Sequence, residues 1–321
     1  MRLYPLTFKP VYKDYPWGNT RLPELLGRSA PEGIYAESWE VSTHRDGESF
    51  VANGEWAGRA FSDVLKVCGK ELLGNAVEGD DFPLLIKIID AAHPLSVQVH
   101  PNNGNAAEVQ GEPKTEMWYF LHEEPAKIYC GLEPGTTRED FESAIERADV
   151  ESILRTVPAH RGEAVFVPGG RVHAIDAGCL ILEIQQNSNT TYRVYDWGRM
   201  GHDGKPRELH MDKALQVIDF EDAADPICEP VPRTERISNV CTSDYFVLDE
   251  LRVDGSLELV ADGSSFHALF SADAGFEIAY GGGYVESVAR GSSVLIPACL
   301  GAYRVKTAGA ACLLKTSVPV K

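Results

Sequence analysis

Apolar and polar residues alternate along most of this chain in short runs, and glycine or proline separates these runs roughly every ten residues. Such runs are typical of β-strands joined by turns, because successive side chains of a strand leave opposite faces of the sheet. We therefore predict a mainly β protein whose strands form a sandwich or barrel. The clearest runs in the first two thirds of the chain are residues 84–89, 96–100, 117–121, 163–167 and 180–185.

Two segments depart from this pattern and favour helices. Residues 62–73 end at Gly74, and glycine commonly follows the last turn of a helix. A later segment has apolar residues at helical spacing, and Thr136 or Thr137 precedes it as a candidate N-cap. Its apolar residues are Phe141, Ala144, Ile145, Ala148 and Leu154. We predict small helical insertions at about 60–75 and 137–157 within the β structure.

An internal repeat indicates how the strands are grouped. Gly162 and Pro168 precede His173, and the same spacing of glycine, five residues and proline recurs at 291–297. The position five residues after the second proline is Ala302, where the first copy has His173. We infer two related jelly-roll modules, of which the second has lost its histidine.

The sequence pattern changes at about residue 238, after which every clear apolar run has the spacing of a β-strand. We therefore predict a larger domain over residues 1–237, which contains the helical insertions, and a smaller β domain over residues 238–321. A length of 321 residues is sufficient for two domains of ordinary size.

The composition argues against several classes of protein. The net charge of −18 argues against nucleic acid or a membrane as a partner, because anionic partners are bound by clustered basic residues. The seven cysteines are scattered and form no Cys-x-x-Cys motif, so we expect neither a disulfide framework nor a zinc ribbon. No signal peptide is visible and no apolar run is long enough for a membrane span, so we expect a cytoplasmic protein.

Gln98 and His100 are the first candidates for a functional site. They lie two residues apart in an alternating run, so in a strand both side chains leave the same face. A lone buried histidine usually has a structural role, but two polar side chains that point inward from one strand are costly without a partner. A metal ion would be such a partner.

Glu116 and His173 complete a set of four candidate ligands. Glu116 precedes the apolar run 117–121, and His173 follows the turn that begins at Pro168. The spacing of glycine, proline, glycine and histidine that ends at His173 resembles the second motif of the cupin superfamily. Nitrogen and oxygen donors without a thiolate suit a borderline divalent metal that keeps an open coordination position. This donor set is typical of a catalytic metal site.

Two cations stand near these candidates in the sequence. Lys114 lies two residues before Glu116, so a strand there presents both side chains on one face. Arg193 lies in the polar segment 186–199, directly after an apolar strand, which is typical of a loop at the mouth of a barrel. Most lysines and arginines are simply solvated, but this pair would supply the local positive charge that an anionic substrate needs in an acidic protein.

Together these motifs resemble those of the type I mannose-6-phosphate isomerases (phosphomannose isomerases), cupin enzymes, in their short bacterial form. The matching segments follow one another in order over residues 15–199, and the last third of the chain matches only in its β texture. The segments are 15–22, 37–42, 83–87, 95–101, 114–118, 167–174 and 186–196.

The resemblance implies a zinc enzyme that interconverts mannose 6-phosphate and fructose 6-phosphate, with one Zn²⁺ per chain. The partner would be a small sugar phosphate, with Arg193 and Lys114 as catalytic residues that also bind substrate and Ser96 in the substrate pocket. Phosphate would be bound by Ser96 and by cations such as Lys114 or Arg199. The metal ligands carried over from the family are Gln98, His100, Glu116 and His173.

The implied aldose–ketose isomerisation moves a proton between C1 and C2 of the sugar through a cis-enediolate. It needs a base that can return the proton and a group that stabilises negative charge on oxygen. Zinc would polarise the carbonyl, and Arg193 would stabilise the anion or help to open the sugar ring. The base stays open between Lys114 and a metal-bound water.

The chain also departs from part of the family. Longer members have an additional helical domain between the lysine–glutamate segment and the second histidine, whereas only residues 123–160 fill that interval here. Two alternatives remain: another metal-dependent cupin enzyme, such as an oxygenase, or a non-catalytic paralogue that binds a sugar phosphate. We expect a monomer or a homodimer.

Overall fold

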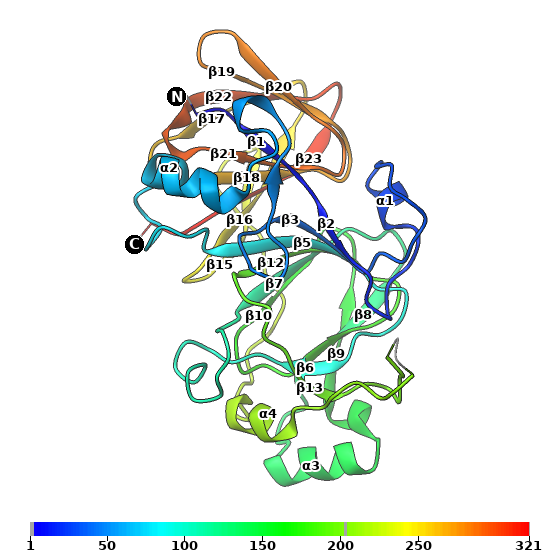
Figure 1. The fold of residues 1–321 in the computed structure, drawn as a ribbon. Helices are drawn as coiled ribbons and strands as arrows, with labels where there is room; N and C mark the ends of the chain where they lie inside the picture. The colour runs from blue at the N-terminus through cyan, green and yellow to red at the C-terminus, as the bar shows by residue number, and fades with distance from the viewer. Residues whose placement is uncertain (1–2, 202–203, 321) are drawn as a thin grey trace.

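Four antiparallel β-sheets form the framework of the protein, and they pack in two pairs (Figure 1). The computed structural model describes residues 3–201 and 204–320. Each pair of sheets encloses its own cluster of buried apolar side chains, as the two sheets of a jelly roll do. The predicted mainly β fold with two jelly-roll modules is therefore confirmed.

The first module occupies the lower part of Figure 1. Its six-stranded sheet has the order β10 (Ala164–Val167), β7 (Glu116–Phe120), β12 (Leu180–Gln186), β5 (Leu84–Asp90), β3 (Glu37–Val41) and β2 (Val11–Lys13). Its five-stranded sheet has the order β13 (Tyr192–Tyr195), β6 (Val97–Val99), β11 (His173–Ile175), β8 (Ala126–Leu132) and β9 (Leu154–Ala159). Strands β5, β7 and β12 are buried on both faces, which explains their almost continuous apolar sequence.

The second module forms the upper part of Figure 1. Its eight-stranded sheet has the order β14 (Val231–Pro232), β15 (Ile237–Thr242), β16 (Val247–Val253), β23 (Ala311–Ser317), β18 (His267–Phe270), β21 (Ser293–Ile296), β1 (Leu6–Lys9) and β4 (Phe50–Val51). Its four-stranded sheet has the order β17 (Ser256–Ala261), β22 (Gly301–Lys306), β19 (Phe276–Tyr280) and β20 (Tyr284–Val288).

A third apolar core joins the two modules. It includes Ile86 and Ile88 of β5 and a chain of phenylalanine rings, in which Phe82 lies 5.3 Å from Phe61 and 4.9 Å from Phe266. Burial of each of these rings contributes roughly 1.5–3 kcal/mol to the free energy of unfolding. The six-stranded sheet therefore has one face on this shared core and its other face toward the five-stranded sheet.

Helices are few and short. They are α1 (Leu22–Leu25), α2 (Phe61–Leu73), α3 (Arg138–Glu146) and α4 (Met211–Val217), with 3-10 turns at Gly54–Trp56, Val150–Ile153 and Ala298–Leu300. Thr137 caps α3, as one of the two predicted caps, through a capping box with Asp140. The helix ends before Ala148, whose φ of 53° breaks it, so the segment 137–157 is helical only in part. Within the described residues, no helix is long and apolar enough to cross a membrane.

The N-terminal strand belongs to the sheet of the second module. Leu6 and Thr7 of β1 pair with Leu295 and Val294 of β21, and β4 extends the same sheet beyond β1. The polypeptide therefore starts in one module, builds the other, and returns (Figure 1). The division at residue 237 stays a prediction about units of folding, with β1 as a connection between them.

Ten strands of each module correspond in sheet order. The order β10-β7-β12-β5-β3-β2 matches β21-β18-β23-β16-β15-β14, and the order β6-β11-β8-β9 matches β17-β22-β19-β20. Even a break in the register recurs, after Trp39 in β3 and after Asn239 in β15. Among the residues that the structure describes, strands β13, β1 and β4 have no counterpart in the other module. The repeat inferred from glycine and proline spacing thus extends to the whole topology.

One position within the repeat was placed wrongly by counting residues. Ala302 stands five residues after Pro297, but its side chain is exposed, whereas Tyr303 points into the second module and is buried. The 3-10 turn at Ala298–Leu300 lengthens the connection by one residue. The structural equivalent of His173 is therefore Tyr303.

Candidate functional site

A row of polar side chains crosses the five-stranded sheet of the first module. The register pairs Gln98 of β6 with His173 of β11 on one side and with Arg193 of β13 on the other. Residues directly opposite one another in antiparallel strands share one face of the sheet. The structure therefore brings together three side chains that the sequence pointed to separately.

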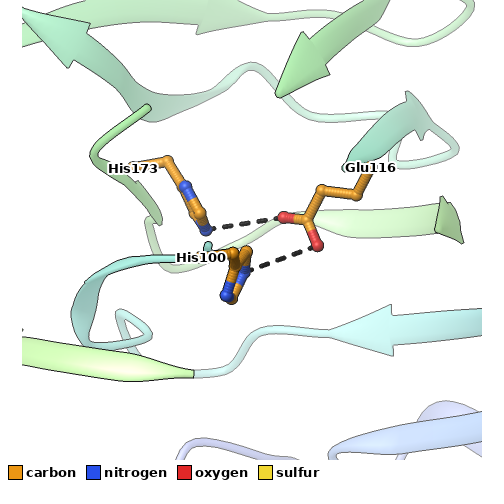
Figure 2. Close-up of side chains that lie close together, drawn as sticks. All are labelled: His100, Glu116 and His173. Atoms are coloured by element: carbon orange, nitrogen blue, oxygen red, sulfur yellow. Dashed lines mark ion pairs between the residues drawn. The ribbon is translucent and has the colours of Figure 1, made fainter. Parts of the chain in front are cut away.

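Glu116 approaches this row from the facing six-stranded sheet. Figure 2 shows its carboxylate facing the imidazoles of both His100 and His173. Nε2 of His100 lies 3.6 Å from Oε2 of Glu116, and Nε2 of His173 lies 3.4 Å from Oε1. All three side chains are buried, and their ligand atoms lie within 4.8 Å of one another. One ion placed between them would contact all three residues.

The environment of these residues fits a metal ion. Nδ1 of His173 lies 2.9 Å from the carbonyl oxygen of Arg171, which fixes the ring so that Nε2 faces the site. Both carboxylate oxygens of Glu116 are buried and accept no hydrogen bond of good geometry. Buried carboxylate oxygens need positive charge nearby: Lys114 supplies one cation, and a divalent metal among the three ligand atoms would supply another.

Gln98 lies beside the same cluster. Its side-chain Nε2 is 3.2 Å from Nε2 of His173, and its Oε1 is 3.4 Å from the hydroxyl of Ser96. A half-turn of the amide would present the oxygen in place of the nitrogen, because the two ends of the group have nearly the same shape. Gln98 is therefore near enough to act as a fourth ligand, and its role stays a prediction.

Lys114 is the cation closest to the cluster. Its Nζ lies 2.7 Å from Oε2 of Glu116 and 3.1 Å from Nε2 of His100. Burial, helped by the charge of Lys114, lowers the pKa of His100 to about 3. Burial alone would raise the pKa of Glu116, but Lys114 and the two histidines hold it well below the usual range. The site thus has a neutral imidazole and an ionised carboxylate, which are the states that bind metal.

Three buried charged residues of the site were missed in the sequence. Lys87 Nζ lies 2.9 Å from Oε1 of Glu183 and 3.4 Å from Oε2 of Glu37, and Lys114 lies 3.9 Å from Glu183. Burial and the charge of Glu116 raise the pKa of Glu183. The signal was present, since Lys87 and Glu183 are single charges within apolar strands. Charges of alternating sign therefore lead from Glu37 to the metal cluster.

A cavity of about 260 Å³ opens above the cluster. It contains all the predicted substrate-binding residues, Ser96, Lys114 and Arg193, together with Gln98. Arg199, which the sequence suggested for phosphate, does not line it, whereas Arg207 does. The remaining lining residues are Tyr15, Trp17, Glu37, Lys87, Ile89, Leu95, Ile175, Glu183, Asn189 and Thr191.

Comparisons with known proteins agree with this arrangement. Residues 6–131 match the family model of the phosphomannose isomerase type I catalytic domain. Mannose-6-phosphate isomerase ManA of Bacillus subtilis is 37% identical over 314 residues, which cover 95% of this chain and 97% of that protein. The chain belongs to the type I phosphomannose isomerase family.

Relatives in this family support the fold as well. The crystal structure of mannose 6-phosphate isomerase from Bacillus subtilis matches with a TM-score of 0.89 and 31% identity, over 98% of this chain and 99% of that chain. The probable mannose-6-phosphate isomerase GmuF of the same organism is 39% identical over 258 residues, which cover 78% of this chain and 81% of that protein. The modules are therefore those of a phosphomannose isomerase, with the cupin fold.

Membership in the phosphomannose isomerase family leaves the individual site residues as predictions. The match to the family model ends at residue 131, before His173 and Arg193. These two residues are instead placed by geometry, because they share a row with Gln98 across β11, β6 and β13. The structure shows a group that could bind a metal, and the identity of that metal is part of the proposal below.

Proposed function

We propose that this chain is a zinc-dependent isomerase that interconverts mannose 6-phosphate and fructose 6-phosphate through a cis-enediolate. The observation that carries the proposal is the His100–Glu116–His173 cluster, which adjoins a polar cavity shared with Arg193 and Lys114. The names of the phosphomannose isomerase relatives give the substrate pair. The same observations support one sugar phosphate and one Zn²⁺ per chain.

The ligands of the metal would be His100, Glu116 and His173 with the amide oxygen of Gln98. Nitrogen and oxygen donors of this kind suit zinc and its neighbours among the divalent metals. When bound, zinc acts as a Lewis acid that draws electron density from the sugar carbonyl. The three buried side chains exclude bulk water from this end of the cavity, which strengthens every charge interaction there.

Arg193 would stabilise the enediolate. Its guanidinium lines the cavity, and Nη1 donates a hydrogen bond to the carbonyl of Glu208 at 2.9 Å. Nε is buried and has no hydrogen-bond partner, and the positive charge of the guanidinium beside the cavity would stabilise a developing anion. The side chain is therefore held in place by one nitrogen, with its charge at the wall of the cavity.

Lys114 would serve as a substrate-binding and catalytic residue. Its Nζ lies among Glu116, His100 and Glu183, at the cavity edge of the metal cluster. From this position an ammonium group can donate hydrogen bonds to the sugar oxygens, and a neutral amine can move a proton between C1 and C2. Lys114 and a water molecule are the two candidates for the base.

The test is isomerisation of mannose 6-phosphate by the purified protein, after chelation, and after zinc is added back. We expect turnover that disappears with the chelator and returns with zinc. Absence of turnover at one zinc per chain would overturn the proposal. Stabilisation by mannose 6-phosphate without turnover would indicate a binding paralogue, and oxygen consumption with iron would indicate another cupin enzyme. A cytoplasmic location and a monomer or homodimer stay predictions.

A further inference from the structure

Three arginines lie near the buried carboxylate of Asp196, beside the cavity. Arg207 holds Asp196 through two hydrogen bonds, Nε to Oδ2 at 2.7 Å and Nη2 to Oδ1 at 2.5 Å. Arg199 Nη2 lies 3.9 Å from the same Oδ1. Arg193, three residues before Asp196 on β13, is the third. Three positive groups thus lie near two carboxylates, the buried Asp196 and the exposed Glu208.

This cluster has more positive than negative groups. Burial lowers the pKa of Arg193, and the charge of Arg207 adds to the effect. Burial also lowers the pKa of Arg199, with a further decrease from Arg207, although Asp196 opposes it. Nε of Arg193 and Nη1 of Arg199 are both buried without a hydrogen-bond partner. In a chain of net charge −18, such a cluster is a local site for an anion.

The three arginines have different tasks. Arg199 donates a hydrogen bond to the carbonyl of Pro94, and its side chain does not line the cavity. It therefore supports the loop that leads to Ser96. Arg193 and Arg207 both line the cavity, and Arg193 shares its row with Gln98 of the metal site. Arg207 lines the cavity outside that row, and it is not paired with the carboxylates Glu116, Glu183 and Glu37 as Lys114 and Lys87 are.

The pair with Asp196 leaves donors on Arg207 available. A guanidinium has five N–H donors, and Asp196 takes one on Nε and one on Nη2. The donors of Nη1 are not used by Asp196, and together with the second donor of Nη2 they suit the oxygens of a phosphate group. Asp196 is itself buried, so it fixes the direction of the guanidinium with little freedom.

We propose that Arg207, oriented by Asp196, binds the phosphate group of the substrate and determines the preference for phosphorylated sugars. The proposal rests on the function proposed above, because both use the same cavity. Arg207 is then a specificity-determining residue, and Asp196 is a positioning residue. Arg193 and Lys114 remain with the reacting end of the sugar.

The test compares Arg207→Gln with the wild type in the zinc-loaded enzyme. We expect the KM for mannose 6-phosphate to rise about 10- to 100-fold, the range for loss of charge-assisted hydrogen bonds, while kcat changes little. Inhibition by inorganic phosphate should weaken by a similar factor. Arg304→Gln is the matched control, since Arg304 forms an exposed ion pair with Glu258 in the second module. It should leave KM, kcat and phosphate inhibition unchanged.

Asp196→Asn tests the positioning role. It keeps Arg207 but removes the charge that orients it, so KM should rise by less than in Arg207→Gln, again with kcat preserved. Arg207→Lys keeps the charge without the fork and should give an intermediate KM. A residue with a merely structural role would lower the melting temperature without this split between KM and kcat.

Several outcomes would overturn the proposal. One is a folded Arg207→Gln with wild-type KM and phosphate inhibition, and another is a loss confined to kcat. If Arg207→Gln does not fold, Arg207→Lys decides the question by the same two readouts. If the wild type does not isomerise mannose 6-phosphate at all, calorimetry with inorganic phosphate on both proteins still tests Arg207. Weaker phosphate binding by the variant would then support Arg207 while the isomerase proposal fails.

Discussion

The two modules share one topology, yet only the first has a candidate metal cluster within the residues that the structure describes. The register gives the equivalent positions. Glu116 pairs with the last residue of β10, and His267 pairs in the same way with the last residue of β21, so these two positions are equivalent. Tyr303 is likewise equivalent to His173. In the second module the set Gln98, His100, Glu116 and His173 is replaced by Leu259, Ala261, His267 and Tyr303.

The replacement changes how the polar groups are satisfied. Nδ1 of His267 lies 2.8 Å from the hydroxyl of Tyr303, so the two groups form a hydrogen bond with each other. Glu116 and His173 cannot do this when both present acceptors across 3.4 Å. The second module therefore has a hydrogen-bonded pair where the first has acceptors that could bind an ion.

A buried ion pair persists in both modules with its polarity reversed. Lys87 of β5 lies 2.9 Å from Glu183 of β12, and at the matching positions Asp249 of β16 lies 3.0 Å from Lys315 of β23. This pair is thus compatible with a module that lacks a metal cluster. The first module differs from the second in three features: the candidate metal ligands, the cavity, and strand β13, which supplies Arg193.

The largest expected difference between the two modules comes from replacing His173 in the first and Tyr303 in the second. His173→Ala should reduce bound metal to near zero and turnover by at least about 10³-fold, since metal catalysis supplies several kcal/mol. Tyr303→Phe should keep both and lose about 1 kcal/mol of stability, because His267 loses its partner. Metal analysis, kcat and thermal unfolding give the answer. Equal metal content in the two variants would contradict the assignment of the site.

A substitution of Arg193 tests the contribution of β13, the strand of the first module that has no equivalent in the second. Arg193→Ala should lower kcat by about 10²- to 10³-fold, the usual effect of losing one group that stabilises an oxyanion. Bound metal should stay at one per chain, because Arg193 is not a ligand. The control is Arg155→Ala, which removes an ion pair with Asp225 away from the cavity. Loss of metal together with turnover would instead make Arg193 a structural residue.

The next largest effect is expected on stability, when the lysine of each buried ion pair is replaced. Lys87→Met leaves Glu183 and Glu37 buried without their cation and should cost about 3–5 kcal/mol of unfolding free energy. Lys315→Met should cost less, because Asp249 keeps Asn239 at 3.2 Å. Urea unfolding measures both variants. Turnover should fall only in Lys87→Met, and an equal fall in both would place the second module in the reaction.

The smallest effect concerns pH. Burial, with a contribution from Lys315, lowers the pKa of His267 to about 3 from the ordinary 6.5. The unfolded chain takes up a proton below pH 6.5 and the folded chain does not, so stability falls as the pH falls from 6.5 toward 3. The loss should be about 2 kcal/mol by pH 5, at about 1.4 kcal/mol per unit. His267→Asn should remove this part of the slope in urea titrations at several pH values.

The sequence predicted the parts of the site that follow from local spacing. Alternation placed Gln98 and His100 on one face, and the Pro168 turn placed His173 near them. The strands around residues 84–89 and 180–185 were also evident, but their continuous apolar character conceals which face meets the cavity. Lys87 and Glu183 were therefore missed. In a strand that is buried on both sides, the sequence does not alternate between polar and apolar residues, so it does not indicate which side chains face the cavity.

Other features depend on contacts between distant segments. Arg207 lies in a polar loop, where nothing in the sequence separates it from a solvated arginine, and only its pairing with Asp196 brings it to the cavity. Tyr303 was displaced from the expected Ala302 by a one-residue change in a turn. A shift of one residue moves every side chain of a strand to the other face. Equivalent positions therefore cannot be found by counting residues from a turn whose length has changed.

The pairing of Leu6 with Leu295 has a consequence for biosynthesis. The partner of the first strand leaves the ribosome 289 residues later (295 minus 6), which takes roughly 15–60 s at ordinary elongation rates. During that time β1 has an open edge, while the sheets of the first module can already assemble around the ligand set. A nascent chain stalled before β21 would thus display the complete candidate metal cluster next to an unpaired strand, a state suited to chaperone binding.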